Sequence, residues 1–139
     1  MKRLLLDTNV AVRFLLGEST PQGRAAAAVF AKCDRREMIL VLEPLVLAEI
    51  IFVLTSYYQK PRPSVADTLA ALLQSPGIEC TGRTFALRAL NTFKARPKIH
   101  WVDCFLGAIS AEARRPVVSF DCDFGRLDGA KLCDPSTPT

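Results

Sequence analysis

The stretch LLLDTN, residues 4–9, decides the fold of this 139-residue chain. Its short, fully apolar run is typical of a strand that is buried on both faces, as at the centre of a parallel sheet. Asp7 follows this run directly, so it should lie at the carboxyl end of the strand, where open α/β sheets bind their ligands. A second interpretation stays open, because Asp is also a preferred N-cap for the helix that the next residues predict.

Length and composition are those of a single globular domain. Half of the residues are hydrophobic and 23% are charged, which excludes a disordered chain. No apolar run reaches the roughly 18 residues that a membrane span needs, so we expect no membrane association. The five cysteines are odd in number and none are spaced as CxxC, which indicates reduced thiols and a cytoplasmic location. The net charge of +4 permits an anionic partner such as RNA.

Short apolar runs alternate with helix-like stretches along the whole chain. Strands are predicted at residues 4–6, 38–42, 78–81, 117–120 and 130–133. Helices are predicted at residues 10–16, 21–35, 45–58, 64–74, 82–95 and 101–113, the fourth opened by a capping box of Ser64 and Asp67. This alternation predicts a single three-layer α/β/α domain with a central, mostly parallel sheet at residues 1–134. Residues 135–139 are predicted to form a flexible C-terminal tail.

Acidic residues in unusual surroundings are the candidates for chemistry. Glu49 lies inside the apolar helix LVLAEIIFVL, where a lone carboxylate is costly unless it is paired or binds a metal ion. Asp103 begins a predicted helix, where an N-cap is the alternative role. Asp121 follows the strand at 117–120 and so repeats the position of Asp7. Asp123 is better interpreted as a turn or cap residue.

If the predicted strands lie side by side, the carboxylates of Asp7, Glu49, Asp103 and Asp121 converge at one edge of the sheet. Clustered carboxylates repel and raise one another's pKa values, and a divalent cation removes that cost. Oxygen ligands without histidine or thiolate partners suit Mg²⁺ or Mn²⁺ rather than zinc. The pattern therefore predicts a site for one or two such ions.

Four segments, in this order, resemble the PIN-domain ribonucleases, and most closely the VapC-like toxins of prokaryotic toxin–antitoxin pairs. The segments are LLLDTN, LAEIIFVL, WVDCFLGAISA and SFDCDFGRL. The resemblance implies a metal-dependent endoribonuclease whose acidic quartet is Asp7, Glu49, Asp103 and Asp121, with Asp123 as a secondary ligand. It also implies that Thr8 or Asn9, and Ser119, orient these acids by hydrogen bonds.

The resemblance also implies a mechanism and partners. A metal-activated water would attack the RNA phosphodiester in line and leave 5′-phosphate and 3′-hydroxyl ends, but no residue can be assigned as the base. The expected partners are a second copy of the chain, forming a homodimer, and a VapB-like antitoxin that inserts a segment into the acidic site. The rival interpretation is a catalytically weak PIN-like domain that serves RNA binding or protein assembly without cleavage.

A basic stretch lies between Glu79 and Asp103, where no acid occurs. Arg83, Arg88 and Lys94 in this stretch are the predicted RNA-binding residues, since cations there would contact phosphates. A solvated helix face is the more common meaning of such a run. Two other functions are disfavoured, because Asn9 stands where an aspartyl phosphatase needs an acid and no glycine-rich phosphate loop follows the first strand.

Overall fold

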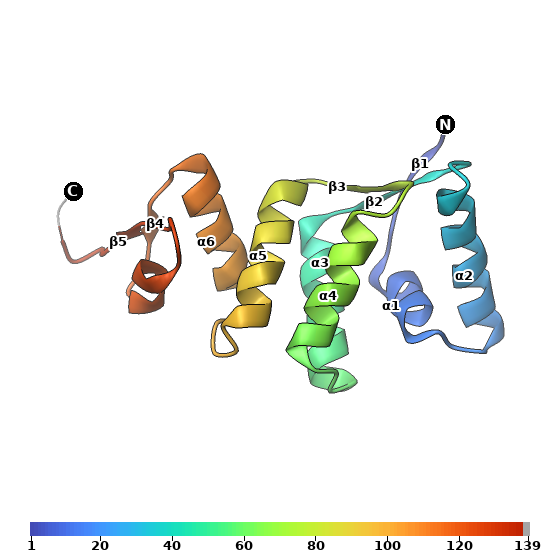
Figure 1. Cartoon of the computed structure of the whole chain (residues 1–139), viewed down its shortest axis with the longest axis horizontal. Helices are drawn as coiled ribbons and strands as arrows, with labels where there is room; N and C mark the ends of the chain where they lie inside the picture. Colours follow the sequence, from blue (N-terminus) through green and yellow to red (C-terminus); the bar gives the residue numbers. More distant parts are fainter. Residues whose placement is uncertain (138–139) are drawn as a thin grey trace. The chain divides into compact units, whose positions relative to one another are not determined.

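Parallel strands and six α-helices make up the part of the chain that the computed structural model describes, residues 1–137 (Figure 1). This composition confirms the predicted α/β class with a parallel sheet. The chain divides into two units, Met1–Arg83 and a second unit that begins at Thr84. The single domain over residues 1–134 stays a prediction.

The first unit contains three strands joined by helical connections. Its elements are β1 (Arg3–Leu5), α1 (Thr8–Leu16), α2 (Pro21–Asp34), β2 (Ile39–Leu42), α3 (Pro44–Phe52), the π-helical turn η1 (Val53–Tyr57), α4 (Arg62–Leu73) and β3 (Ile78–Cys80). The strands pair in parallel in the order β1-β2-β3, with Leu4 opposite Leu40 and Leu40 opposite Ile78. Leu42, Leu47, Ile50, Leu69 and Leu73 are the largest fully buried side chains of this unit.

The first strand does not have the central place that its apolar run predicted. Within the first unit β2 is central and β1 is an edge strand, with Leu5 77% exposed. The predicted burial on both faces is not found in β1, because all three of its residues are exposed. Leu6, just beyond β1, is buried and anchors the chain where it turns into α1.

Helix ends in the first unit follow local sequence signals with two exceptions. Gly17, with φ 63°, ends α1, and the Thr20 hydroxyl accepts a hydrogen bond from the Gly23 N–H at 3.0 Å to begin α2. The capping box predicted at Ser64 is wrong, because α4 already begins at Arg62, after Pro61. A proline such as Pro63 fits the first helical turn because its φ is pre-set and it needs no N–H partner there. The second exception is that α3 ends at Phe52 and continues as the wider turn η1.

The second unit contains two helices and a short parallel strand pair. Its elements are α5 (Arg83–Ala95, of which Arg83 belongs to the first unit), α6 (Trp101–Ala113), β4 (Val117–Val118), the 3₁₀ turn η2 (Cys122–Arg126) and β5 (Leu132–Cys133). Trp101 packs edge-to-face on Phe93, with ring centroids 5.8 Å apart. The buried Ser110 hydroxyl accepts a hydrogen bond from the Lys131 N–H at 2.9 Å, which ties α6 to the chain before β5.

Two further observations concern membrane-spanning helices and the C-terminal tail. No helix within residues 1–137 is long and apolar enough to cross a bilayer. Residues 135–137 form a turn in which the Thr137 N–H donates to the Asp134 carbonyl at 3.0 Å. Residues 138 and 139 lie outside the described residues, so the flexible tail at 135–139 stays a prediction.

Gly77, at the entrance to β3, gives a test of the first unit's packing. Its φ is +73°, and a Cβ there would lie 2.7 Å from the carbonyl oxygen of Cys33. We expect Gly77→Ala to destabilise the protein by about 2 to 5 kcal/mol, combining the left-handed backbone cost with a backbone clash. Gly17→Ala is the matched control, since Gly17 has φ +63° but no atom within 4 Å of a Cβ, and it should lose only about 1 to 2 kcal/mol. Equal losses in urea unfolding would contradict the packing argument.

Candidate active site

A cavity of about 260 Å³ lies just beyond the carboxyl end of β1. Its lining residues come from the chain around α1, α3 and η1, and they are Asp7, Thr8, Asn9, Val12, Arg13, Glu18, Glu49, Val53 and Tyr58. The structure thus brings Asp7 and Glu49, two acids predicted from separate motifs, to the same cavity. We call this the acidic cavity.

Asp7 serves as the N-cap of α1 and also lines the acidic cavity. Its Oδ1 accepts a hydrogen bond from the Thr8 N–H at 2.8 Å. An ionised carboxylate has about four acceptor sites, so one capping bond leaves capacity for a ligand. The two interpretations of Asp7 are therefore compatible.

Thr8, a lining residue of this cavity, is buried, and its hydroxyl lacks a partner. Its Oγ1 has no hydrogen-bond partner within the described residues, although the residue is only 7% exposed. Leaving a buried polar group unpaired costs about 1 to 3 kcal/mol. Thr8, a residue that lines the acidic cavity, therefore carries an unsatisfied hydroxyl.

Glu49 reaches the cavity from the exposed side of α3. Its neighbours Ile50 and Ile51 are buried, whereas Glu49 itself is exposed. The premise that its carboxylate is enclosed by apolar groups is therefore wrong, because the buried side chains of α3 point elsewhere. What distinguishes Glu49 is that it shares a cavity with Asp7.

Arg13 and Glu18 are residues of the acidic cavity that the sequence did not single out. Arg13 Nη1 and Glu18 Oε2 form a half-buried ion pair at 2.8 Å across the end of α1. This pair neutralises Glu18 within the cavity, so Asp7 and Glu49 carry its excess negative charge. A spacing of five residues across a helix end gives no recognisable pattern, which is why sequence reasoning missed the pair.

The second unit holds the remaining predicted acids near the start of α6. Asp103 lies in the first turn of α6, whose N-cap is His100, so the N-cap alternative for Asp103 is wrong. Burial raises the pKa of Asp103, and the neighbouring carboxylates of Asp121 and Asp123 raise it further against the opposing effect of His100. Repulsion of this kind arises only between charges that lie close together.

Asp121 and Asp123 are held by the turn that follows β4. The Ser119 hydroxyl accepts a hydrogen bond from the Asp121 N–H at 2.9 Å, a bond to the backbone of this acid, and the orienting of its carboxylate by Ser119 stays a prediction. Asp121 Oδ1 in turn accepts from the Asp123 N–H at 2.9 Å and caps η2. Asp123 has the turn position predicted for it, and its Oδ1 lies 3.8 Å from Nη1 of Arg126.

The model of the PIN domain family matches residues 4–130 of the chain. The chain belongs to the PIN domain family. The match spans parts of both units and includes the five candidate acids, Asp7, Glu49, Asp103, Asp121 and Asp123. PIN domains are generally nucleases and typically use divalent metal ions. No curated protein matches the chain.

The donor atoms of this PIN domain fit a hard divalent cation. Within residues 1–137, no three acidic, histidine or cysteine side chains meet closely enough to hold a metal ion by themselves. The acidic cavity nevertheless offers the carboxylates of Asp7 and Glu49 together with the unpaired Thr8 hydroxyl. All of these are oxygen donors, and Mg²⁺ is commonly bound through one or two carboxylates with water and substrate phosphate completing its shell.

The basic residues predicted for RNA binding already have partners within the fold. Arg83 Nη2 donates to the Ile78 carbonyl at 2.6 Å. Arg88 donates to the Glu112 carboxylate at 3.1 Å and to the Asp128 carbonyl at 2.8 Å. Lys94 lies in the last turn of α5. Arg83 and Arg88 therefore stabilise the fold, and RNA binding by the three residues stays a prediction.

Arg88 also lines a cavity of about 430 Å³ in the second unit, between α5, α6 and the chain after η2. Arg96, Asn91 and Thr92 line the same space. Arg96 Nη2 lies 3.4 Å from the carbonyl oxygen of Arg126, at the far end of η2 from Asp121. Two guanidinium groups in one polar cavity are suited to phosphate contacts.

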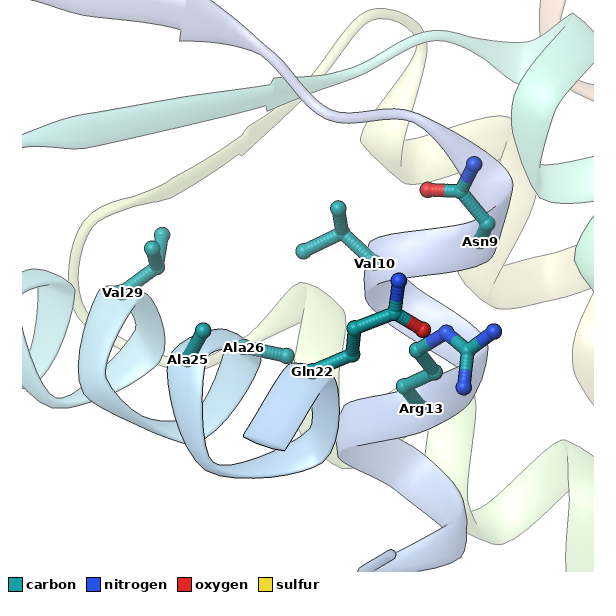
Figure 2. A pocket seen from close by; sticks show the side chains of 7 residues that line it. All are labelled: Asn9, Val10, Arg13, Gln22, Ala25, Ala26 and Val29. Carbon is teal, nitrogen blue, oxygen red and sulfur yellow. The ribbon is translucent and has the colours of Figure 1, made fainter. Parts of the chain in front are cut away.

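A third cavity, of about 300 Å³, lies between α1 and α2 (Figure 2). Val10, Ala25, Ala26 and Val29 form its apolar part, and Gln22 points toward Arg13 at its polar end (Figure 2). Asn9 and Arg13 line both this cavity and the acidic cavity. Asn9 thus lines two different cavities, and its predicted role in orienting the acids stays a prediction.

Proposed function

We propose that this PIN domain is a metal-dependent endoribonuclease that acts as the toxin of a toxin–antitoxin pair. The observation that supports the enzyme best is the acidic cavity, where Asp7 and Glu49 meet a buried Thr8 hydroxyl without a partner. A scaffold gains nothing from an unpaired hydroxyl beside two carboxylates, whereas a cation with its bound waters satisfies all three groups.

The proposed catalytic carboxylates are Asp7, Glu49, Asp103 and Asp121, with Asp123 as a secondary ligand. A bound Mg²⁺ or Mn²⁺ would polarise a phosphate oxygen and lower the pKa of a coordinated water. Thr8 would orient such a water through its hydroxyl, and Ser119 holds the backbone of Asp121 in place. Asp103 lies near Asp121 and Asp123, whose charges together with burial raise its pKa, so a bound cation would relieve the repulsion among these carboxylates.

RNA as substrate is supported by charge. The chain carries a net charge of +4, and Arg88 and Arg96 line one polar cavity of the second unit. A guanidinium has five N–H donors, so Arg88 can contact a phosphate while it keeps its two internal bonds. We include Arg83, Arg88 and Lys94 in the proposed RNA-binding surface on this basis.

The proposed partners are a second copy of the chain and a VapB-like antitoxin. The apolar cavity between α1 and α2 supports an antitoxin, since it would accept an aliphatic side chain next to Asn9 and Arg13, which also line the acidic cavity (Figure 2). A cytoplasmic location is proposed because none of the five cysteines, all within the described residues, forms a disulfide.

Cleavage of an unstructured, 5′-labelled RNA tests the enzyme directly. We expect fragments in Mg²⁺ or Mn²⁺, complete loss of cleavage in EDTA, and recovery when excess metal is returned. The fragments should carry 5′-phosphate and 3′-hydroxyl ends. Cleavage that persists in EDTA would contradict metal dependence, and RNA binding without cleavage in either metal would favour the rival role in binding or assembly.

A further inference from the structure

Tyr58 lines the acidic cavity together with Asp7 and Glu49, and the mechanism above does not use it. The residue is 39% exposed, and its ring makes an edge-to-face contact with the ring of Tyr57 at 4.8 Å between centroids. Tyr57 is itself 77% exposed. The core therefore does not cover the two tyrosines, and Tyr58 lies at the same cavity as the two carboxylates.

The backbone holds Tyr58 firmly in this position. The Tyr58 N–H donates to the Val53 carbonyl at 3.1 Å and closes the π-helical turn η1. The Thr55 hydroxyl donates to the Ile51 carbonyl at 2.7 Å, which favours bending at this point of the helix. Single π-helical turns cost stability and occur frequently at functional sites.

The residue after Tyr58 adds a second unusual backbone feature. Gln59 has φ 54°, a left-handed conformation that is uncommon for residues other than glycine. The Lys60 N–H then donates to the Leu54 carbonyl at 2.9 Å, which fixes the chain on the far side of the tyrosine. A left-handed residue followed by such a hydrogen bond is a common way to end a helix, so these bonds fix where the turn stops and where Tyr58 lies.

The charges of the acidic cavity indicate what Tyr58 contacts. Because Arg13 neutralises Glu18, the cavity keeps the two negative charges of Asp7 and Glu49. A phosphate can enter such a space only with a cation, whereas the neutral face of a nucleobase can lie on the tyrosine at its side. An RNA nucleotide combines these two groups a short distance apart.

We propose that Tyr58 is the stacking platform for one unpaired base of the RNA, next to the phosphate that is cleaved. This inference rests on the proposed ribonuclease function and adds to it a residue that contacts a base of the RNA. Stacking requires a base that is free of pairing, so the enzyme selects single-stranded RNA at this position. Tyr58 acts as a specificity residue and takes no part in the bond-breaking step.

Binding of a fluorescent single-stranded RNA, measured by anisotropy in Ca²⁺ to slow cleavage, tests the proposal. Tyr58→Ala should weaken binding about 5- to 150-fold, the effect of losing one base–aromatic stack. Tyr58→Phe keeps the ring and should bind within about twofold of wild type, and Tyr58→Leu, which keeps apolar bulk without a ring, should resemble the alanine variant. Unchanged melting temperatures would show that all three variants fold.

A series of RNAs with one abasic nucleotide at successive positions locates the stacked base. At one position the missing base should weaken binding to wild type and to Tyr58→Phe, yet leave binding to Tyr58→Ala unchanged. If the alanine variant binds every RNA as wild type does, or if the phenylalanine variant is as weak as the alanine variant, the stacking role is overturned. Wild type that binds no RNA overturns it as well.

Different experimental results would overturn this inference and the proposed ribonuclease function. Wild-type cleavage in Mg²⁺ combined with unchanged binding by Tyr58→Ala removes only the stacking role. Absence of cleavage combined with a position-specific abasic effect keeps the base stacked on Tyr58, but it removes the enzyme and with it the place of that base beside a cleaved phosphate. A Tyr58→Ala variant that loses affinity for a partner peptide but not for RNA would assign the tyrosine to a protein contact instead.

Discussion

Asp7→Asn should abolish RNA cleavage and leave the metal-free protein as stable as wild type. Asn caps helices as well as Asp does, so the hydrogen bond from the Thr8 N–H to the side chain at position 7 is kept. What the substitution removes is a negative charge in the acidic cavity, which is the property that a metal ion needs. Stability and activity should therefore respond separately to this one change.

Melting curves in EDTA and in excess Mg²⁺ measure this separation. Wild type should gain about 2.7 kcal/mol at a hundredfold excess of metal over Kd. For a chain of this length the gain corresponds to a rise of about 5 to 10 °C in Tm. Asp7→Asn should lose most of that rise.

Asp34→Asn is the matched control for this experiment. Asp34 is an exposed acid at the end of α2 and lines none of the cavities described above. Its replacement removes the same charge from the protein but should leave cleavage and the metal-induced rise in Tm unchanged. An equal rise in Asp7→Asn and in wild type would exclude Asp7 as an important ligand, whatever the effect on cleavage.

Most elements could be predicted because their ends are determined by nearby residues. Gly17 and the Thr20-Pro21 pair end and begin helices through local geometry alone. The helix predicted at residues 101–113 has those limits in the structure. Signals of this kind act over one helical turn, so a single sequence contains them in full.

Features that depend on packing could not be predicted in this way. The apolar run of β1 indicated a central strand, yet its place in the sheet depends on which strands pair with it. The π-helical turn η1 lies in a stretch whose sequence pattern predicts a regular α-helix. Ser64 matched a capping pattern, but the prolines before it had already begun the helix.

The same distinction between local signals and packing applies to the candidate site. The candidate acids at strand ends and at the start of α6 could be picked out from the sequence, because the order of residues alone shows a carboxylate next to an apolar run. Tyr58 and the Arg13–Glu18 ion pair could not, since only the folded chain brings them to Asp7. Arg88 was predicted to bind RNA, with a solvated helix face as the alternative, and its two bonds to residues distant in sequence became visible only in the structure.

Asp103→Asn should lower cleavage at least about a hundredfold and, unlike most substitutions at half-buried sites, stabilise the metal-free protein. This decrease in cleavage should be larger than the decrease of about 10- to 100-fold that is usual when a residue that only hydrogen-bonds a metal ligand is mutated. The gain follows from the raised pKa of Asp103, caused by burial first and by Asp121 and Asp123 next. A carboxyl whose pKa is raised by folding binds its proton more tightly in the folded chain, so its charge destabilises the fold.

The sign of this effect can be read from unfolding free energies measured in EDTA across a pH series. The destabilisation of wild type by Asp103 is absent below the unfolded pKa of about 3.9 and grows as pH rises through the higher folded value. Asp103→Asn should therefore match wild type at the acidic end and exceed it at neutral pH. Asp134→Asn is the control of opposite sign, because hydrogen bonds from Ser136 lower the pKa of Asp134 and its replacement cannot stabilise the protein at neutral pH. If Asp103→Asn is less stable than wild type at neutral pH without metal, the carboxylate of Asp103 supports the fold. A loss of RNA cleavage in this variant would then no longer be evidence that Asp103 acts in catalysis.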